Sequence, residues 1–82
     1  MDIRRILAAN LRRHRRAAGL SQEGLAFECG LHRTYVSGVE RGVRNPTVMV
    51  LARLARALDI GPGDLLTPDP GREKASAGDR QV

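Results

Sequence analysis

The chain has 82 residues, with 14 basic and nine acidic side chains and a formal net charge of +5. This length suits one domain with a modest core and leaves no room for an enzyme cleft closed by a second domain. One cysteine excludes an internal disulfide, and one thiol with two histidines is too little for a zinc site. We therefore expect a cytoplasmic protein that uses no metal and no other cofactor.

The positive charge is concentrated in residues 1–66, which hold eleven arginines against six carboxylates, whereas residues 67–82 are neutral overall. A basic domain suggests a polyanionic partner, and the planar guanidinium of arginine can hold a phosphate or a guanine edge at two points. A GC-rich genome would also favour arginine codons. Phe27 and Tyr35 are the only aromatic residues, too few for stacking on single strands. The start of the chain has no long apolar run, so we expect neither signal peptide nor membrane span.

Apolar spacing predicts a first helix over residues 3–18. The positions that share one of its faces are Ile3, Leu7, Leu11, His14 and Ala18. Gly19 ends this helix, and Ser21 is a good N-cap for a second, short helix over residues 22–29. Gly30 ends the second helix in turn.

A third helix is predicted over residues 33–40 or 33–41, followed by Gly42 and a loop over 43–46. Thr47 caps a fourth helix over 48–58. Its expected buried stripe is Val48, Leu51, Leu54, Ala55 and Leu58.

Ile60 is expected to plug the core, and Gly61 with Pro62 opens a short fifth helix, because proline suits a first helical turn. Leu65 and Leu66 would then seal the core. Beyond them, proline, glycine, serine and charges dominate, so we expect a folded domain over 1–66 and a disordered tail over 67–82.

Residues 22–41 have the pattern of a helix-turn-helix, in which two short helices cross at a tight turn. Ala26 is small where the next helix must pack, and Gly30 stands where the turn needs a left-handed backbone. Leu25, Val36 and Val39 supply the apolar contacts to the rest of the domain.

This region and its flanks resemble the phage repressor and Cro-type family of bacterial helix-turn-helix regulators, the xenobiotic-response-element (XRE) family. The matching segments are residues 19–23, 25–26, 30–31, 35–37, 40–42, 44–47 and 51–58. The resemblance covers residues 3–66 and implies an all-α, five-helix, lambda-repressor-like domain. In that fold the third helix enters the major groove of duplex DNA and the second crosses above it.

The resemblance places four positions of the third helix toward the bases: Arg33, Thr34, Ser37 and Gly38. Arg33 is expected to be the main reader, because an arginine can donate twice to a guanine edge. The alternative is that it only pairs with a phosphate. Gly38 has no side chain, so this helix is expected to read fewer bases than some relatives.

The expected phosphate contacts are Ser21, Gln22, His32, Tyr35, Arg41, Arg44 and Asn45. Gln22 matches a family residue that binds a phosphate and braces the third helix, and backbone amides at the start of a helix also attract anions. The alternative for Arg41 and Arg44 is a solvated basic loop, and Tyr35 could equally pack against the turn. His32 stands where the family usually has a serine or threonine cap, and a plain exposed histidine is its simpler reading.

Arg15, Cys29 and Glu40 are expected to lie in the interior of the domain. In the family an arginine of the first helix pairs with a glutamate of the third, and the matching residues here are Arg15 and Glu40. We expect this ion pair to be structural. Cys29 stands at a position that is mostly small and buried, so inert packing is favoured over redox sensing.

The function expected is that of a transcription regulator, a repressor that binds a palindromic operator as a homodimer, because one short helix reads little sequence. Ile6, Met49 and Val50 are expected to be exposed apolar residues that mark a subunit contact. Duplex DNA is the expected partner, in the nucleoid, with a toxin or another regulator as a further candidate. An antitoxin and a restriction-modification controller are alternative roles. A protein-interaction module that has lost DNA binding is disfavoured by the arginines at 33, 41 and 44, and an enzyme by the lack of a nucleophile–base pair.

Overall fold

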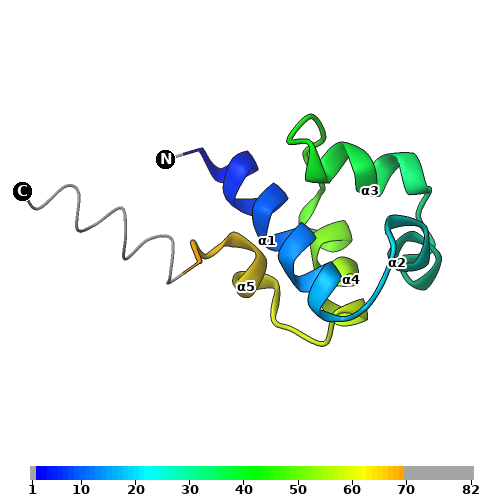
Figure 1. Cartoon of the computed structure of the whole chain (residues 1–82). Coiled ribbons are helices and arrows are strands. Elements are labelled where there is room, and N and C mark those ends of the chain that lie inside the picture. Colours follow the sequence, from blue (N-terminus) through cyan, green and yellow to red (C-terminus); the bar gives the residue numbers. More distant parts are fainter. Residues whose placement is uncertain (1, 70–82) are drawn as a thin grey trace, which may run out of the picture.

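The computed structural model describes residues 2–69 and contains five helices there (Figure 1). They are α1 (Ile3–Ala17), α2 (Gln22–Cys29), α3 (Arg33–Glu40), α4 (Val48–Ala57) and α5 (Pro62–Leu66). Residues 2–69 form no strand, so the predicted all-α, five-helix architecture is confirmed, with helix ends within one residue of those expected. Most of the predicted tail, residues 70–82, lies outside the described residues.

Four of the helices end in the same way, with one residue in the left-handed conformation that reverses the chain. These residues are Gly19, Gly30, Gly42 and Asp59. After each of them, the next amide donates to a carbonyl five residues earlier, as in Leu31 to Ala26 at 2.8 Å. The glycines were predicted as helix ends. Asp59, with φ of 58°, was not, because an aspartate carries a weaker signal for this conformation than a glycine does.

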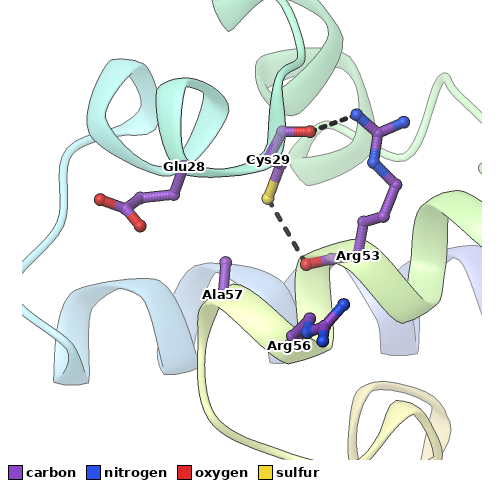
Figure 2. Close-up of a pocket in the computed structure, with 5 residues that line it drawn as sticks. All are labelled: Glu28, Cys29, Arg53, Arg56 and Ala57. Carbon is purple, nitrogen blue, oxygen red and sulfur yellow. Dashed lines mark hydrogen bonds between the residues drawn. The ribbon is translucent and has the colours of Figure 1, made fainter.

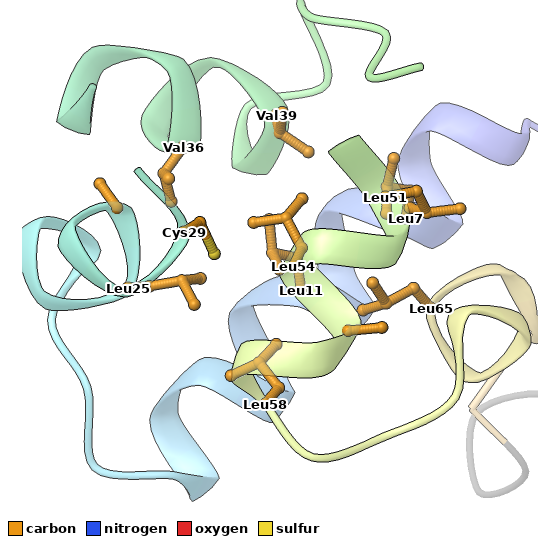
Figure 3. Packing of buried hydrophobic residues seen from close by; sticks show 12 residues of the cluster. Leu7, Leu11, Leu25, Cys29, Val36, Val39, Leu51, Leu54, Leu58 and Leu65 are labelled. Carbon is orange, nitrogen blue, oxygen red and sulfur yellow. The ribbon is translucent and has the colours of Figure 1, made fainter. Parts of the chain in front are cut away.

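The core is formed where α1 and α4 meet the helix-turn-helix and α5 (Figure 3). Leucines dominate it, and four of them are fully buried: Leu11, Leu25, Leu54 and Leu65. Val36 and Val39 of α3 point into the same cluster, which fixes α3 by one face and leaves its other face outward. Burial of each such side chain contributes on the order of 1.5–3 kcal/mol to folding.

Some predicted core positions are wrong. Val48 was expected to be buried but is 80% exposed, because the contact of α4 with the core begins two residues later, at Val50. Val50, expected to be exposed, therefore packs against the cluster. Leu66 is 37% exposed while Leu65 is fully buried, so only one of the two leucines seals the core. Ile6 is half-buried rather than exposed.

A buried asparagine ties α5 to α1, a contact that sequence analysis missed. The Asn10 side-chain amide donates to the carbonyls of Leu65 and Thr67 at 3.0 and 2.7 Å. Arg13 donates to the Asn10 oxygen at 3.0 Å and pairs with Asp69 at 3.7 Å. Residues 67–69 thus lie against α1 as a direct continuation of the folded domain.

Candidate nucleic-acid interface

The outward face of α3 carries several of the residues expected to contact DNA. Arg33, Thr34 and Arg41 are exposed, and Ser37 is half-buried beneath Arg41, whose Nε donates to the Ser37 hydroxyl at 3.3 Å. α2 packs across α3, with Ala26 buried where the helices meet and Gly30 left-handed in the turn (φ 67°). The predicted crossing of two short helices is therefore present, with a cationic face left open to solvent.

Glu40 is the only carboxylate on α3, and it faces away from that open surface. Its side chain is 1% exposed and accepts two hydrogen bonds from Arg15 of α1, at 2.6 and 3.1 Å. Arg12 donates to the Glu40 backbone carbonyl at 2.9 Å and adds a second positive charge 3.8 Å from the carboxylate. This Glu40 cluster joins α1 to the end of α3 and keeps negative charge off the surface expected to meet DNA.

Burial of Glu40 by itself raises the pKa of the carboxyl group. The hydrogen bonds from Arg15 and Gln22, with the charges of Arg15 and Arg12, outweigh it, so the pKa of Glu40 lies below its ordinary value. The hydrogen bond to Glu40 in turn raises the pKa of Arg15 against the opposing effect of burial. Both groups are therefore charged at neutral pH, and each stabilises the other.

Gln22 is the third donor to Glu40. Its Nε2 lies 3.0 Å from the Glu40 Oε1, so Gln22 braces α3 from the start of α2, as expected. Ser21 caps α2 by accepting from the Gly24 amide at 2.9 Å. The start of this eight-residue helix is held against the end of α3 through Gln22 and Glu40, and the free amides at a helix N-terminus attract phosphates.

Arg44 and Gly38 are in contact with each other. Gly38 is buried because the side chain of Arg44, from the loop after α3, lies over it. The Arg44 guanidinium also lies above the ring of Tyr35, 5.9 Å from its centroid, and Tyr35 packs against the edge of the core. Asn45, the last expected phosphate contact, is exposed next to Arg44.

A link between α2 and α4 was not predicted from the sequence (Figure 2). The Arg53 guanidinium donates to the carbonyl of Cys29, and the Cys29 thiol lies 3.7 Å from the carbonyl of Arg53. These two bonds, beside an open hollow lined also by Glu28, Arg56 and Ala57, hold the helix-turn-helix against α4. No spacing rule brings residues 29 and 53 together, so only the fold could show this contact.

The pKa of the Cys29 thiol is raised, chiefly by burial, which works against formation of the reactive thiolate and agrees with a packing role. His32 occupies the N-cap position of α3, is exposed and makes no side-chain capping bond there. Among residues 2–69 no three His, Cys, Asp or Glu side chains are grouped to hold a metal ion. None of the described helices is long and apolar enough to cross a membrane.

Two short helices crossed at a tight turn, with a cationic second helix turned outward, define a helix-turn-helix domain of the DNA-binding type. The family model HTH_3, described as "Helix-turn-helix", matches residues 11–65. The chain thus belongs to this XRE-type family of DNA-binding transcription regulators, and the resemblance stated above is confirmed.

The relatives support the same family. Control protein C.SmaI of Serratia marcescens is 52% identical over 67 residues, which cover 82% of this chain and 80% of that protein. The crystal structure of the hypothetical transcription factor NHTF from Neisseria superposes with a TM-score of 0.83 at 44% identity, covering 90% of this chain and 85% of that one. The restriction-modification controller protein C.AhdI from Aeromonas hydrophila has a TM-score of 0.73 at 52% identity, with 76% and 90% covered.

Proposed function

We propose that this protein binds a specific duplex DNA sequence as a homodimer and represses transcription from a palindromic operator. The observation that carries the proposal is the separation of charge on α3. Arg33 and Arg41 are exposed on its outer side, while Glu40, its only carboxylate, is buried and neutralised on the inner side. A helix prepared in this way presents cations and donors to the edges of base pairs without a repelling carboxylate.

In this proposal Arg33 reads a guanine and Thr34 contacts the neighbouring base. Ser21 and Gln22, at the start of α2, hold one phosphate, and Arg41 and Asn45 hold the next, with His32 beside them. Phosphate contacts of this kind set the register of the helix on the duplex, while the base contacts give the specificity.

The homodimer is supported by two observations. A recognition helix of eight residues covers few base pairs, and a second copy about 34 Å away along the DNA would double the sequence read. Val48 and Met49, adjacent at the start of α4, are 80% and 74% exposed and would be covered by a subunit contact.

Selection of bound sites from random duplex DNA tests the proposal as a whole. The expected result is a palindrome whose half-sites are one helical turn apart, bound by a species that sediments as a dimer at micromolar concentration. Binding to all duplexes with one affinity would contradict sequence-specific recognition. A monomer that binds a single half-site tightly would contradict the homodimer. Repression is tested separately, by a reporter gene placed behind the selected site.

The similarity to C.SmaI and C.AhdI favours one regulatory role over the others, that of a controller of a restriction-modification system. The expectation is that genes for an endonuclease and a methyltransferase lie beside the gene for this protein, with the selected palindrome upstream of them. A toxin gene in that place would favour the antitoxin role instead.

A further inference from the structure

The outer surface of α3 lacks a side chain at Gly38, and Arg44 from the following loop fills the space. A Cβ atom built on Gly38 would lie 2.4 Å from Cγ of Arg44, closer than real Cβ atoms approach other atoms. Cγ is near the root of the arginine side chain, so turning the guanidinium alone would not relieve this clash. The stem of Arg44 can rest on α3 only because residue 38 is a glycine.

The turn after α3 brings Arg44 to this place. The Gly42 amide donates to the Val39 carbonyl, and the Val43 amide to the Gly38 carbonyl, both at 3.0 Å. Gly42 is left-handed, with φ of 77°, so the chain reverses its direction at the end of α3. Residue 44 then lies beside residue 38 rather than beyond the end of the helix.

Tyr35 provides a second contact between α3 and the side chain of Arg44. It precedes Gly38 by three residues and so lies on the same strip of α3, where its ring lies 5.9 Å from the guanidinium carbon of Arg44. Thr34, which precedes Gly38 by four residues, is the exposed neighbour of this strip. The Arg44 side chain therefore lies over the strip of α3 formed by Tyr35 and Gly38, and helical spacing makes Thr34, a residue proposed to contact a base, the neighbouring position of that strip.

Glycine is among the poorest helix formers, and α3 has only eight residues, so Gly38 weakens the helix that carries the proposed base contacts. We infer that Gly38 is a specificity-determining positioning residue: it seats Arg44 on α3, so that Arg44 reads a base pair as part of one surface with Thr34 instead of acting as a general phosphate contact. This inference rests on the proposed function, and it changes the expected role of both residues. The proposed base contact at position 38 is made by Arg44 in place of the glycine.

A double-mutant cycle tests the inference with the full chain. The four proteins are wild type, Gly38→Ala, Arg44→Ala and the double variant. The quantity measured is the affinity for the selected palindrome divided by the affinity for versions with one base pair changed in each half-site. Gly63→Ala on α5 is the matched control, because it makes the same chemical change at a helical position where the new methyl group meets no side chain and no other segment of the chain within 4 Å. Thermal unfolding of each variant separates loss of fold from loss of recognition.

Each single variant is expected to lose discrimination at one shared base pair by about tenfold, the range of one good arginine–guanine contact. The double variant is expected to lose no more than either single variant, because Gly38 acts only through Arg44. Gly63→Ala should match the wild type. Losses that multiply in the double variant, or a Gly38→Ala protein with full discrimination, would overturn the inference.

Arg44→Lys provides a second test that does not depend on the folding of Gly38→Ala. Lysine keeps the charge but lacks the planar fork, so it should keep the salt dependence of binding and lose the discrimination at that base pair. Equal weakening on every sequence by Arg44→Ala would assign Arg44 to a phosphate and overturn the inference alone. Wild-type protein with no sequence preference would instead remove the proposed function, and the inference with it.

Discussion

Two groups of arginines around α3 carry the same charge in different surroundings. Arg15, with Arg12 at the rim, lies against Glu40, and its side chain is only 10% exposed. Arg33 and Arg41 stand on the outer face of α3 in water. Arg15 has exchanged most of its hydration for hydrogen bonds to the Glu40 carboxylate and the Leu20 carbonyl, whereas the second group can still exchange water for an outside partner.

The comparison shows why net charge alone predicts a partner poorly. The inner arginines stabilise the fold by aligning α1 with the end of α3. The proposed DNA contacts belong to exposed arginines, namely Arg33 and Arg41 of the outer group and Arg44 in the loop after α3. Gln22 connects the two groups, since it donates to Glu40 from the start of α2, the helix whose first amides are proposed to meet a phosphate. The inner cluster thus sets the position from which the outer group would reach DNA.

The largest effect on the free energy of unfolding is expected from loss of Arg15, the main partner of Glu40. Arg15→Ala leaves the Glu40 carboxylate buried without its main partner, which should lower the free energy of unfolding by about 3–5 kcal/mol. A domain of this size has little stability to spare, so the variant would be largely unfolded at moderate temperature. Urea titration followed by circular dichroism measures the change. Arg16→Ala, at the adjacent exposed position, is the matched control and should change stability by less than about 0.5 kcal/mol. Equal effects of the two substitutions would show that the ion pair with Glu40 adds nothing to the free energy of unfolding beyond what an exposed arginine contributes.

The Glu40 cluster should make the free energy of unfolding depend on pH. The pKa of Glu40 is lowered in the folded protein, so its contribution is fully present above the ordinary pKa of a glutamate in the unfolded chain. That contribution is lost as the pH falls through the lower pKa that Glu40 has in the folded protein. The free energy of unfolding should be measured from pH 7 downward for the wild type and for Glu40→Gln. The difference between the two proteins should become smaller below about pH 4.3. A gap that stays constant to pH 2.5 would mean that the carboxylate is not the source of the stabilisation.

Much of this fold was predictable because local signals agree with one another. Ser21 and Thr47 cap α2 and α4 as expected, and the apolar spacing identified Leu11, Val36 and Leu54 as core positions. The Arg15–Glu40 pair came from the family resemblance, and the structure confirms its geometry. These features depend on residues close in sequence or on a pattern shared with relatives.

The contacts that escaped prediction join distant residues through geometry that no local pattern encodes. Asn10 reaches carbonyls 55 and 57 residues later, and Arg53 reaches the end of α2. The burial of Gly38 was missed for the same reason, because it depends on how the turn at Gly42 directs Arg44. Val48 was placed in the core because the helical period fits it, although the packing of α4 starts only at Val50.

On the outer side, Arg33→Ala should have the larger effect on recognition. The proposed contact with a guanine predicts a loss of about 1–3 kcal/mol on the selected palindrome and relaxed specificity at one base pair per half-site. Stability should stay near that of the wild type, because the side chain is exposed. Competition binding against operators with single base changes measures both effects. If the sequence preference is untouched, Arg33 is not a base reader.

Arg41→Ala should have the smallest effect and the least selective one. Arg41 lies at the end of α3, where its Nε donates to Ser37, and its proposed partner is a phosphate. Its loss should weaken binding to specific and random duplexes by the same factor and reduce the slope of log affinity against log salt by about one. Arg56→Ala removes another exposed arginine, from α4 beside the hollow next to Cys29, and should leave that slope unchanged. If Arg41→Ala changed the preferred sequence while the slope stayed constant, this arginine would read bases, and the division of the outer group into base and phosphate contacts would have to be redrawn.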